Sequence, residues 1–460
     1  MDSVPVIAVF DIGKTNKKLF LFDEDYKILH QYSTQLAESF DDDGFPCENL
    51  TSLRSFIFDA LADVAGMDQF NIRAVNISAY GASLVHLDSE CSPVGPLYNY
   101  LKPFPCELGA EFYAKYGGEE RFSMETASPV LGNLNSGLQL YRLKKEKPLF
   151  LKRIKHSIHL PQYISNMLTG KVYSDITSIG CHTGLWNFEK NHYHNWIQRE
   201  ELLNLLAPLQ PANKVFPPLF PGIHYSIGIG LHDSSAALIP YLVSFTEPFV
   251  LLSTGTWSIS LNPFDHTPLT AEELRNDCLN YLQYKGLPVK ASRLFAGYEY
   301  EQQVKRIADH FHSDLNKYHT MEFDLNIIAK LESNHDGAFE ETIVNAIAFS
   351  KRDLSLFTND KEAYHHLMLD IIEQQKASTS LVLKGAKVKR IFVDGGFSKN
   401  IVFMHLLATA FPDMEVFAAS MAQATAVGAA LAIHSAWNSK PQPTDLIELK
   451  YYSAKQNTAI

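Results

Sequence analysis

The sequence predicts an α/β protein built from two related domains. Strand-like apolar runs alternate with stretches of helical periodicity along the chain, as in layered α/β folds. The 460 residues exceed what a single hydrophobic core usually supports. A strand–turn–strand pattern, VIAVFDIGKTNKKLFLF at 6–22, is echoed by FVLLSTGTWSISL at 249–261. We therefore expect one domain over 1–242, a second over 243–438, and a tail over 439–460.

The individual elements follow from residue type and spacing. Runs rich in β-branched and aromatic residues predict strands at 6–10, 18–22, 74–80, 84–88, 248–253, 258–261, 390–396 and 414–419. Apolar residues at helical spacing predict helices at 53–66, 161–170 and 298–311, and another that starts near Ser398 to Asn400. The small-residue segment 423–437 is expected to be a helix that packs on the Gly395-Gly396 turn or lies in a core.

Composition narrows the classes of partner. With 46% hydrophobic and 20% charged residues, the chain is typical of a soluble globular protein. Forty basic against fifty-one acidic residues give a net charge of -11, which repels nucleic acid and anionic membranes. The amino terminus lacks a basic segment before its short apolar run, and no run reaches the length of a membrane span. These features predict a cytoplasmic protein that binds neither nucleic acid nor membrane.

The cysteines and histidines do not predict a metal site. Cysteines at 47, 91, 106, 181 and 278 are odd in number and form no C-x-x-C pair, which indicates neither a disulfide framework nor a zinc site. The histidine pairs at 192/194, 310/312 and 365/366 lack nearby cysteines and the H-E-x-x-H spacing. We expect them to be surface histidines.

The turn DIGKTNK at 11–17 can hold an anion. Its backbone N–H groups, a hydroxyl and ammonium groups lie between two strands. Asp11 could reach Mg²⁺ through water, and Thr15, Asn16 and Lys18 could face a phosphoryl group that is being transferred. An ordinary hairpin with a basic turn remains the alternative.

Two further segments suit the same chemistry. In GIGLHDSSAALIP at 228–240, Asp233 could take the proton of a hydroxyl, or could cap the helix that follows. Gly395 and Gly396, between a strand and a helix, let a flat ligand or a phosphate approach the backbone, although strand–helix packing would favour them equally.

Five motifs together carry a resemblance. DIGKTNKK, GLHDSSAAL, LLSTGTWSIS, VDGGFSKN and QATAVGAA stand in the order and at about the separations seen in the FGGY carbohydrate kinases, which the chain resembles over nearly its whole length. The resemblance implies an actin/hexokinase-like (ribonuclease H-like) fold with an interdomain cleft. It also implies phosphorylation of a small-molecule sugar or polyol by ATP with Mg²⁺. Homodimer formation is left open.

The resemblance assigns roles to residues by position. Asp233 corresponds to the general base, and Mg²⁺ is expected near Asp11 and Asp233. The residues expected at the nucleotide are Asp11, Gly13, Thr15, Asn16 and Lys18 in a first phosphate loop, Ser253, Thr254, Gly255 and Thr256 in a second, Gly395, Gly396, Ser398 and Asn400 in an adenosine-side turn, and Gly297 within 295–299.

Within the family, the chain looks most like the L-rhamnulose kinase branch. HDSSAAL, STGTWS, and the segments 93–104 and 130–143 carry this likeness, and L-rhamnulose or a related ketopentose or deoxyketohexose is the expected substrate. The implied sugar contacts are Tyr98, Asn99, Asn133, Asn135, Gln139, His232 and Asp233. Lys14 and Gln423 depart from the usual Thr and Glu, and YNYLKP lacks the Asp and Arg of that branch. An actin-like ATP-binding regulator and a kinase for a small non-carbohydrate polyol are the alternatives.

Overall fold

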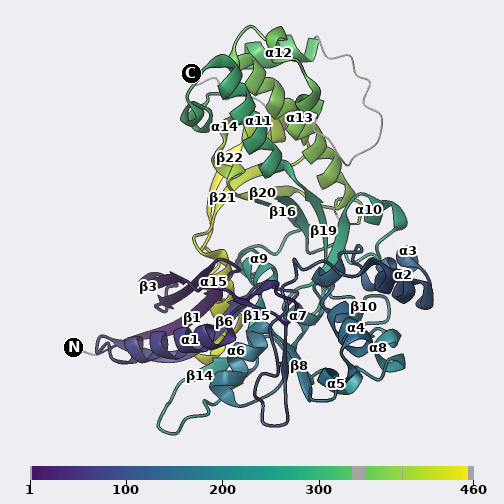
Figure 1. Cartoon of the computed structure of the whole chain (residues 1–460). Coiled ribbons are helices and arrows are strands. Elements are labelled where there is room, and N and C mark those ends of the chain that lie inside the picture. The colour runs from purple at the N-terminus through teal and green to yellow at the C-terminus, as the bar shows by residue number, and fades with distance from the viewer. Residues whose placement is uncertain (1–2, 334–347, 386, 454–460) are drawn as a thin grey trace. The chain divides into compact units, whose positions relative to one another are not determined.

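The computed structural model describes residues 3–333, 348–385 and 387–453, and these fall into two compact units. Unit 1 takes residues 1–244, 280–288 and 423–444, and unit 2 takes 245–279, 289–422 and 445–460. Each unit contains most of one seven-stranded sheet with its helices (Figure 1). The predicted α/β class is therefore confirmed. The compact units exchange segments along the chain, whereas the predicted domains are continuous.

The sheet of unit 1 has the strand order β13-β14-β6-β1-β2-β3, with β15 also paired to β6. Its strands are β1 (Val4–Ile12), β2 (Asn16–Phe22), β3 (Ile28–Gln35), β6 (Phe70–Ala79), β13 (Val215–Phe216), β14 (Ser226–Gly228) and β15 (Leu231–His232). Strands β1, β2 and β3 form an antiparallel meander, and β6 runs parallel to β1, β14 and β15. The carboxyl ends of β1, β6 and β15 therefore lie at one edge of the sheet.

Helices cover this sheet and extend the unit. They are α1 (Leu50–Ala65), α2 (Cys106–Lys115), α3 (Glu119–Thr126), α4 (Ser136–Glu146), α5 (Pro148–Leu151), α6 (Leu160–Thr169), α7 (Ile176–Ile179), α8 (Asn195–Arg199), α9 (Asp233–Ser244) and α15 (Ala424–Ala432). Helix α1 starts where Asn49 accepts a hydrogen bond from Ser52 N, and its apolar face joins that of α6 in a core with β1 and β6. Helix α1 lies against the sheet in Figure 1.

Helix α15 is a core helix of unit 1. It packs on α9 so closely that a Cβ on Gly428 would lie 1.8 Å from Ala236 O. Asn76 on β6 donates a hydrogen bond to Ala429 O at 2.7 Å. Of the two roles expected for segment 423–437, the structure therefore has the core helix, in which the small residues allow close contact with α9.

Short strand pairs complete unit 1. They are β4 (Ser39–Phe40) with β5 (Pro46–Cys47), β7 (Leu84–Leu87) with β8 (His156–His159), β9 (Ser174–Asp175) with β12 (Leu209–Gln210), and β10 (Trp186–Asn187) with β11 (His192–Tyr193). An aromatic core under α2, α4 and α8 includes Phe112, Tyr141 and Trp196. This core supports the layer that carries most of the predicted sugar contacts.

The second sheet has the order β18-β19-β17-β16-β20-β21-β22. Its strands are β16 (Phe249–Thr254), β17 (Ser258–Asn262), β18 (Cys278–Leu282), β19 (Pro288–Leu294), β20 (Arg390–Gly395), β21 (Glu415–Ser420) and β22 (Glu448–Tyr452). Strands β16 and β17 are antiparallel, as are β17 and β19, and β16 runs parallel to β20. Strands β16, β17, β19 and β20 thus repeat the arrangement of β1, β2, β3 and β6, which confirms the echo in the sequence.

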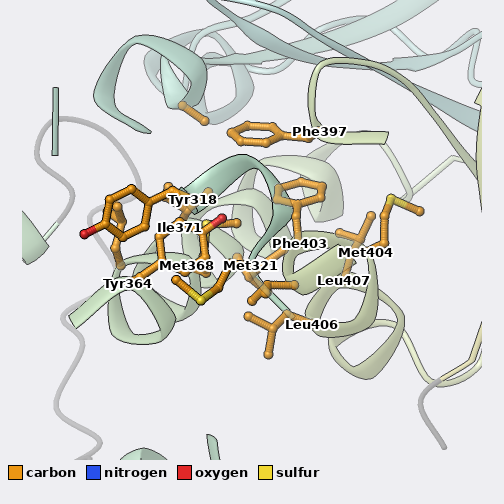
Figure 2. Close-up of a cluster of buried hydrophobic side chains, with 14 of the residues drawn as sticks. Tyr318, Met321, Tyr364, Met368, Ile371, Phe397, Phe403, Met404, Leu406 and Leu407 are labelled. Carbon is orange, nitrogen blue, oxygen red and sulfur yellow. The ribbon is translucent and has the colours of Figure 1, made fainter. Parts of the chain in front are cut away.

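The helices of unit 2 are α10 (Ala271–Arg275), α11 (Ala296–Phe311), α12 (Leu325–Ser333), α13 (Asp360–Leu381) and α14 (Ile401–Ala410). Side chains of α11, α13 and α14 share a buried core with β16 and β20. Figure 2 shows Phe397 lying over Phe403 of α14, and their rings stack with centroids 4.4 Å apart. This contact fixes the end of the Gly395-Gly396 turn on the core.

The expectation for the histidine pairs was wrong in part. His192, His310 and His312 are exposed, but His194, His365 and His366 are buried. His194 caps α8 and pairs with Glu125 at 2.7 Å. His365 and His366 lie on the buried side of α13, where His365 accepts a hydrogen bond from Asp324 N at 3.2 Å. Two neighbouring histidines form no apolar periodicity, so the sequence does not indicate that these side chains are buried.

Candidate active site

The β1–β2 turn is held by a buried ion pair. Lys17 is 2% exposed, and its Nζ donates to Gly13 O at 3.1 Å, to Lys14 O at 3.0 Å and to Glu48 Oε2 at 2.9 Å. The Tyr80 hydroxyl also donates to Glu48 Oε2, at 2.9 Å. Gly13 N donates to Asn16 O at 2.9 Å and closes the turn. The network leaves the predicted residues Thr15 and Asn16 exposed on a fixed backbone.

Asp11 lies at the base of this turn, opposite Lys18 in the β1–β2 register. Burial and the nearby negative charge of Asp233 raise the pKa of Asp11 to about 6, while Lys18 opposes the rise. The two predicted metal-binding carboxylates are therefore close enough to repel each other. Lys18, the cation predicted to face the phosphoryl group, lies across from Asp11 at the base of the turn.

The topology explains why Asp11 and Asp233 come together. Ser78 of β6 faces Asp11 on one side and Leu231 of β15 on the other. All three strands end at the same edge, so β1 delivers Asp11 and β15 delivers Asp233, which starts α9. Asp233 Oδ1 accepts from the N–H of Ser234 at 2.6 Å, the next residue, whereas an N-cap side chain bonds an amide two or three positions ahead. Asp233 therefore does not make the side-chain bond of an N-cap, and its role as a base stays a prediction.

His232 is packed tightly beside Asp233. Its Nε2 lies 3.2 Å from Asp233 Oδ1, and a Cβ on Gly81 would come within 2.7 Å of the ring. The backbone N–H of His232 donates to Thr177 Oγ1 at 3.0 Å, and the Thr177 hydroxyl in turn donates to Asp175. Burial lowers the pKa of His232, and the charge of Asp233 opposes that change. These hydrogen bonds fix the backbone at His232, immediately before the start of α9.

The other predicted sugar contacts hold loops in this structure. Asn99 donates to Pro46 O, Asn133 to Lys102 O, Asn135 to His182 O and Ser128 Oγ, and Gln139 to Ala82 O and Asn133 O, at distances from 2.6 to 2.9 Å. Tyr98 donates to Asp42 at 3.3 Å. Tyr98, Asn133 and Gln139 line a cavity of about 10 Å³, room for roughly one water. Their roles as sugar contacts stay predictions.

The β16–β17 turn in unit 2 is held by hydrogen bonds between uncharged groups. Thr254 Oγ1 donates to Asp394 O at 2.6 Å and accepts from Phe397 N at 2.9 Å, and Thr254 O accepts from Gly396 N at 2.9 Å. A Cβ on Gly395 would lie 1.8 Å from Thr254 O, at a φ of +89° that favours glycine. The predicted residues Ser253, Gly255 and Thr256 are exposed on this turn.

The remaining predicted nucleotide residues of unit 2 surround the same turn, with one exception. Gly297, at the start of α11, would place a Cβ 1.7 Å from Gly255 O. Ser398 is half-buried and its hydroxyl donates to Gly395 O at 2.8 Å. Asn400 instead caps α14, accepting from Phe403 N at 3.0 Å and donating to the Tyr364 hydroxyl at 2.8 Å. Its side chain stabilises the helix start, and its contact with a nucleotide stays a prediction.

Sequence reasoning missed residues that act through pairing distant in the chain. Lys17 and Glu48 are 31 positions apart, and their pairing left no local pattern. Cys181, His182 and His232 also come together, with ligand atoms all within 4.8 Å of one another. The burial of Lys17 between exposed Asn16 and half-buried Lys18 is visible only in the structure, and no signal in the sequence alone marked this lysine.

Among the described residues, no helix has the length and apolar content that a bilayer crossing requires. That finding is compatible with the sequence, in which apolar residues are distributed over short segments.

Comparison with known proteins gives the family. Residues 6–234 match the N-terminal domain of the FGGY family of carbohydrate kinases, and residues 246–442 match the C-terminal domain of carbohydrate kinase FGGY. A rhamnulokinase from Mannheimia succiniciproducens is 24% identical over 276 residues, covering 55% of this chain and 52% of that protein. The chain thus spans about half the length of the curated relatives it matches.

Solved structures share the fold over nearly the whole chain. A carbohydrate kinase from Novosphingobium aromaticivorans superposes with a TM-score of 0.79 at 23% identity, covering 98% of this chain and 94% of that chain. A ligand-bound xylulose kinase from Lactobacillus acidophilus does so with a TM-score of 0.77 at 18% identity and the same coverage. The two family matches and these folds together confirm the resemblance seen in the sequence. The chain belongs to the FGGY family of carbohydrate kinases.

Proposed function

We propose that the chain is an ATP-dependent carbohydrate kinase that phosphorylates a hydroxyl of a ketose, such as L-rhamnulose or a related ketopentose or deoxyketohexose. The observation that carries the proposal is the meeting of Asp11 and Asp233 at the carboxyl edge of the first sheet, beside a turn with exposed polar groups. Family membership and the rhamnulokinase relative support the substrate class.

In this proposal Asp233 is the catalytic base. Its carboxylate accepts the proton of the substrate hydroxyl while that oxygen forms a bond to the γ-phosphorus and the bond from phosphorus to the ADP oxygen breaks. The backbone N–H of Ser234 and the ring of His232 hold Oδ1 of Asp233, at 2.6 and 3.2 Å. A base that is held in one place needs no reorientation when the sugar hydroxyl arrives.

The residues near Asp11 fit Mg²⁺. Two carboxylates that repel each other offer the hard oxygen ligands that Mg²⁺ prefers, and a bound dication would relieve the repulsion that raises the pKa of Asp11. When bound, Mg²⁺ would withdraw charge from phosphate oxygens. Lys18, Thr15 and the turn backbone would contact the phosphoryl group from this side.

The β16–β17 turn of unit 2 is proposed to hold the nucleotide phosphates. Its exposed Ser253 and Thr256 hydroxyls and the backbone of Gly255 offer donors on a turn that close packing by Gly297 and Gly395 keeps compact. Donors fixed before the reaction stabilise charge that develops on phosphate oxygens without a cost of reorganisation.

Two alternatives predict different results. An actin-like ATP-binding regulator would bind ATP with no sugar-stimulated ADP release and would not depend on Asp233. A kinase for a small non-carbohydrate polyol would depend on Asp233 but would show no turnover with ketoses.

The test is a coupled ADP-release assay with ketopentoses, 6-deoxyketohexoses, ketohexoses and glycerol. Asp233→Asn should lower kcat by about 10² to 10⁴-fold while ATP affinity is retained. Asp88→Asn is the matched control, because Asp88 also accepts backbone N–H bonds in a turn of unit 1 but lies in a separate loop. Unchanged turnover in Asp233→Asn would refute the base assignment, and no ADP release with any acceptor would refute the kinase.

A further inference from the structure

Cys181, His182 and His232 form a cluster of metal-binding side chains in unit 1. Cys181 Sγ lies 3.6 Å from His232 Nε2, and one ligand atom from each of the three residues lies within 4.8 Å of the other two. Cys181 and His232 are each 4% exposed. The cluster joins Cys181 and His182, in the loop after α7, to His232 at the end of β15, 50 positions beyond His182.

The distances suit a tetrahedral zinc ion. Zn–S and Zn–N bonds of about 2.3 and 2.1 Å place neighbouring ligand atoms roughly 3.5 Å apart. The separation of Cys181 Sγ and His232 Nε2 already has this value. Thiolate and imidazole are ligands that select zinc over magnesium, which takes oxygen ligands.

The surroundings of His182 favour Nε2 as its ligand atom. His182 Nδ1 lies 3.1 Å from Leu134 O, and because a carbonyl only accepts, Nδ1 must carry the proton. The lone pair of His182 is then on Nε2, the arrangement that metal-binding histidines usually have.

The backbone at His182 is also unusual. Its φ of +39° lies in the left-handed region that non-glycine residues rarely adopt. Asn135 donates to His182 O at 2.8 Å and holds the residue in this conformation. Strained residues of this kind gather at ligand sites, and here the strain sets the His182 ring beside that of His232, with centroids 6.2 Å apart.

We propose that Cys181, His182 and His232 bind one Zn²⁺ ion and that this ion inhibits phosphoryl transfer. Binding replaces the thiol proton of Cys181, which passes to solvent. Asp233 Oδ1, 3.2 Å from His232 Nε2, is in reach as a fourth ligand or hydrogen-bond partner of a bound water. A zinc ion here would take His232 and the carboxylate of Asp233 away from the substrate. The inhibition rests on the proposed function, whereas the binding does not.

The binding test uses Co²⁺ as a spectroscopic substitute for Zn²⁺ on the full chain. Wild-type protein should bind about one equivalent with a thiolate-to-cobalt charge-transfer band, and ZnCl₂ should remove the band. Cys181→Ser should lose the band and bind Zn²⁺ at least tenfold more weakly. Cys47→Ser is the matched control, since Cys47 is also a buried cysteine of unit 1, and this variant should keep both the band and the Zn²⁺ affinity.

The activity test compares ZnCl₂ inhibition of wild type and Cys181→Ser at constant Mg²⁺ and ATP. Chelation of ATP by zinc affects both proteins equally, so only binding at the cluster can make wild type tenfold more sensitive. Absence of the cobalt band, or a band that persists in Cys181→Ser, would refute the site. A band without selective inhibition would refute the inhibitory role alone, and absence of any kinase activity would leave the spectroscopic result to decide the binding.

Discussion

The two hairpin turns have the same topology but are held in place by different means. Under the β1–β2 turn, a buried Lys17–Glu48 pair bonds the carbonyls of Gly13 and Lys14. Around the β16–β17 turn, Gly395 and Gly297 let neighbouring backbone approach, and the Thr254 hydroxyl joins two strands. One turn is held by charge and the other by close backbone packing.

The difference is consistent with the roles that we propose for the two turns. The first turn lies next to Asp11 and Asp233, whose negative charge Lys18 offsets in part, while the Lys17 ammonium is paired with Glu48 beneath the turn. In the proposed function, the second turn offers neutral donors to phosphate, and a close backbone approach keeps these donors fixed. The two forms of support should therefore fail differently when they are mutated.

Lys17→Met should have the largest effect. It leaves Glu48 buried without its partner, and breaking a buried ion pair costs about 3–5 kcal/mol of the free energy of unfolding. Urea unfolding measures this loss. Lys14→Met is the control, because it removes an exposed pair with Glu38 that contributes about 1 kcal/mol or less. Equal losses in the two variants would show that the first turn is not held by the buried charge.

Gly395→Ala should have the second largest effect, a loss of about 3 kcal/mol in the free energy of unfolding. The new Cβ would lie 1.8 Å from Thr254 O at a φ of +89°, so crowding and backbone strain add. The free energy of unfolding, measured with urea, and the affinity for ATP, measured by calorimetry, should both decrease. Gly255→Ala, where a Cβ meets no atom within 4 Å, should keep the stability. Equal stability of Gly395→Ala and wild type would contradict the role of close packing at this turn.

The raised pKa of Asp11 predicts that the Asp11 carboxyl makes the free energy of unfolding depend on pH. The folded chain binds this proton up to about pH 6 and the unfolded chain only to about 3.8, so stability falls as pH rises between these values. Asp11→Asn should therefore be more stable than wild type by on the order of 2 kcal/mol above pH 6, with no difference below pH 4. Thermal unfolding of both proteins across pH 4–8 measures it, and a constant difference would contradict the assignment.

Much of the fold could be predicted because its signals are local. All eight predicted strands and the helices at 53–66, 161–170 and 298–311 are present, with ends shifted by a few residues. The apolar runs that end in Asp11 and Thr254 even predicted that the two hairpins are related. Each of these depends on residues close together in the chain, where periodicity is visible.

The supports of the site could not be predicted for the opposite reason. Lys17 with Glu48, and Cys181 with His232, are brought together by the sheet across 31 and 51 positions. Amides such as Asn135 have the composition of a sugar site, yet their hydrogen bonds go to backbone groups of loops. A residue type shows what a side chain can bond, but only the fold decides which partner it meets.

Thr254→Val should have the smallest effect and separates hydrogen bonding from packing at the second turn. The change keeps the shape but removes the hydroxyl that donates to Asp394 O and accepts from Phe397 N, at a cost of about 1–2 kcal/mol. Thr254→Ser keeps the hydroxyl and loses only a methyl group. If urea unfolding shows Thr254→Ser to be the less stable variant, the methyl contact matters more than the hydrogen bonds. The turn would then be held by packing alone, which would make its contrast with the charged support of the first turn complete.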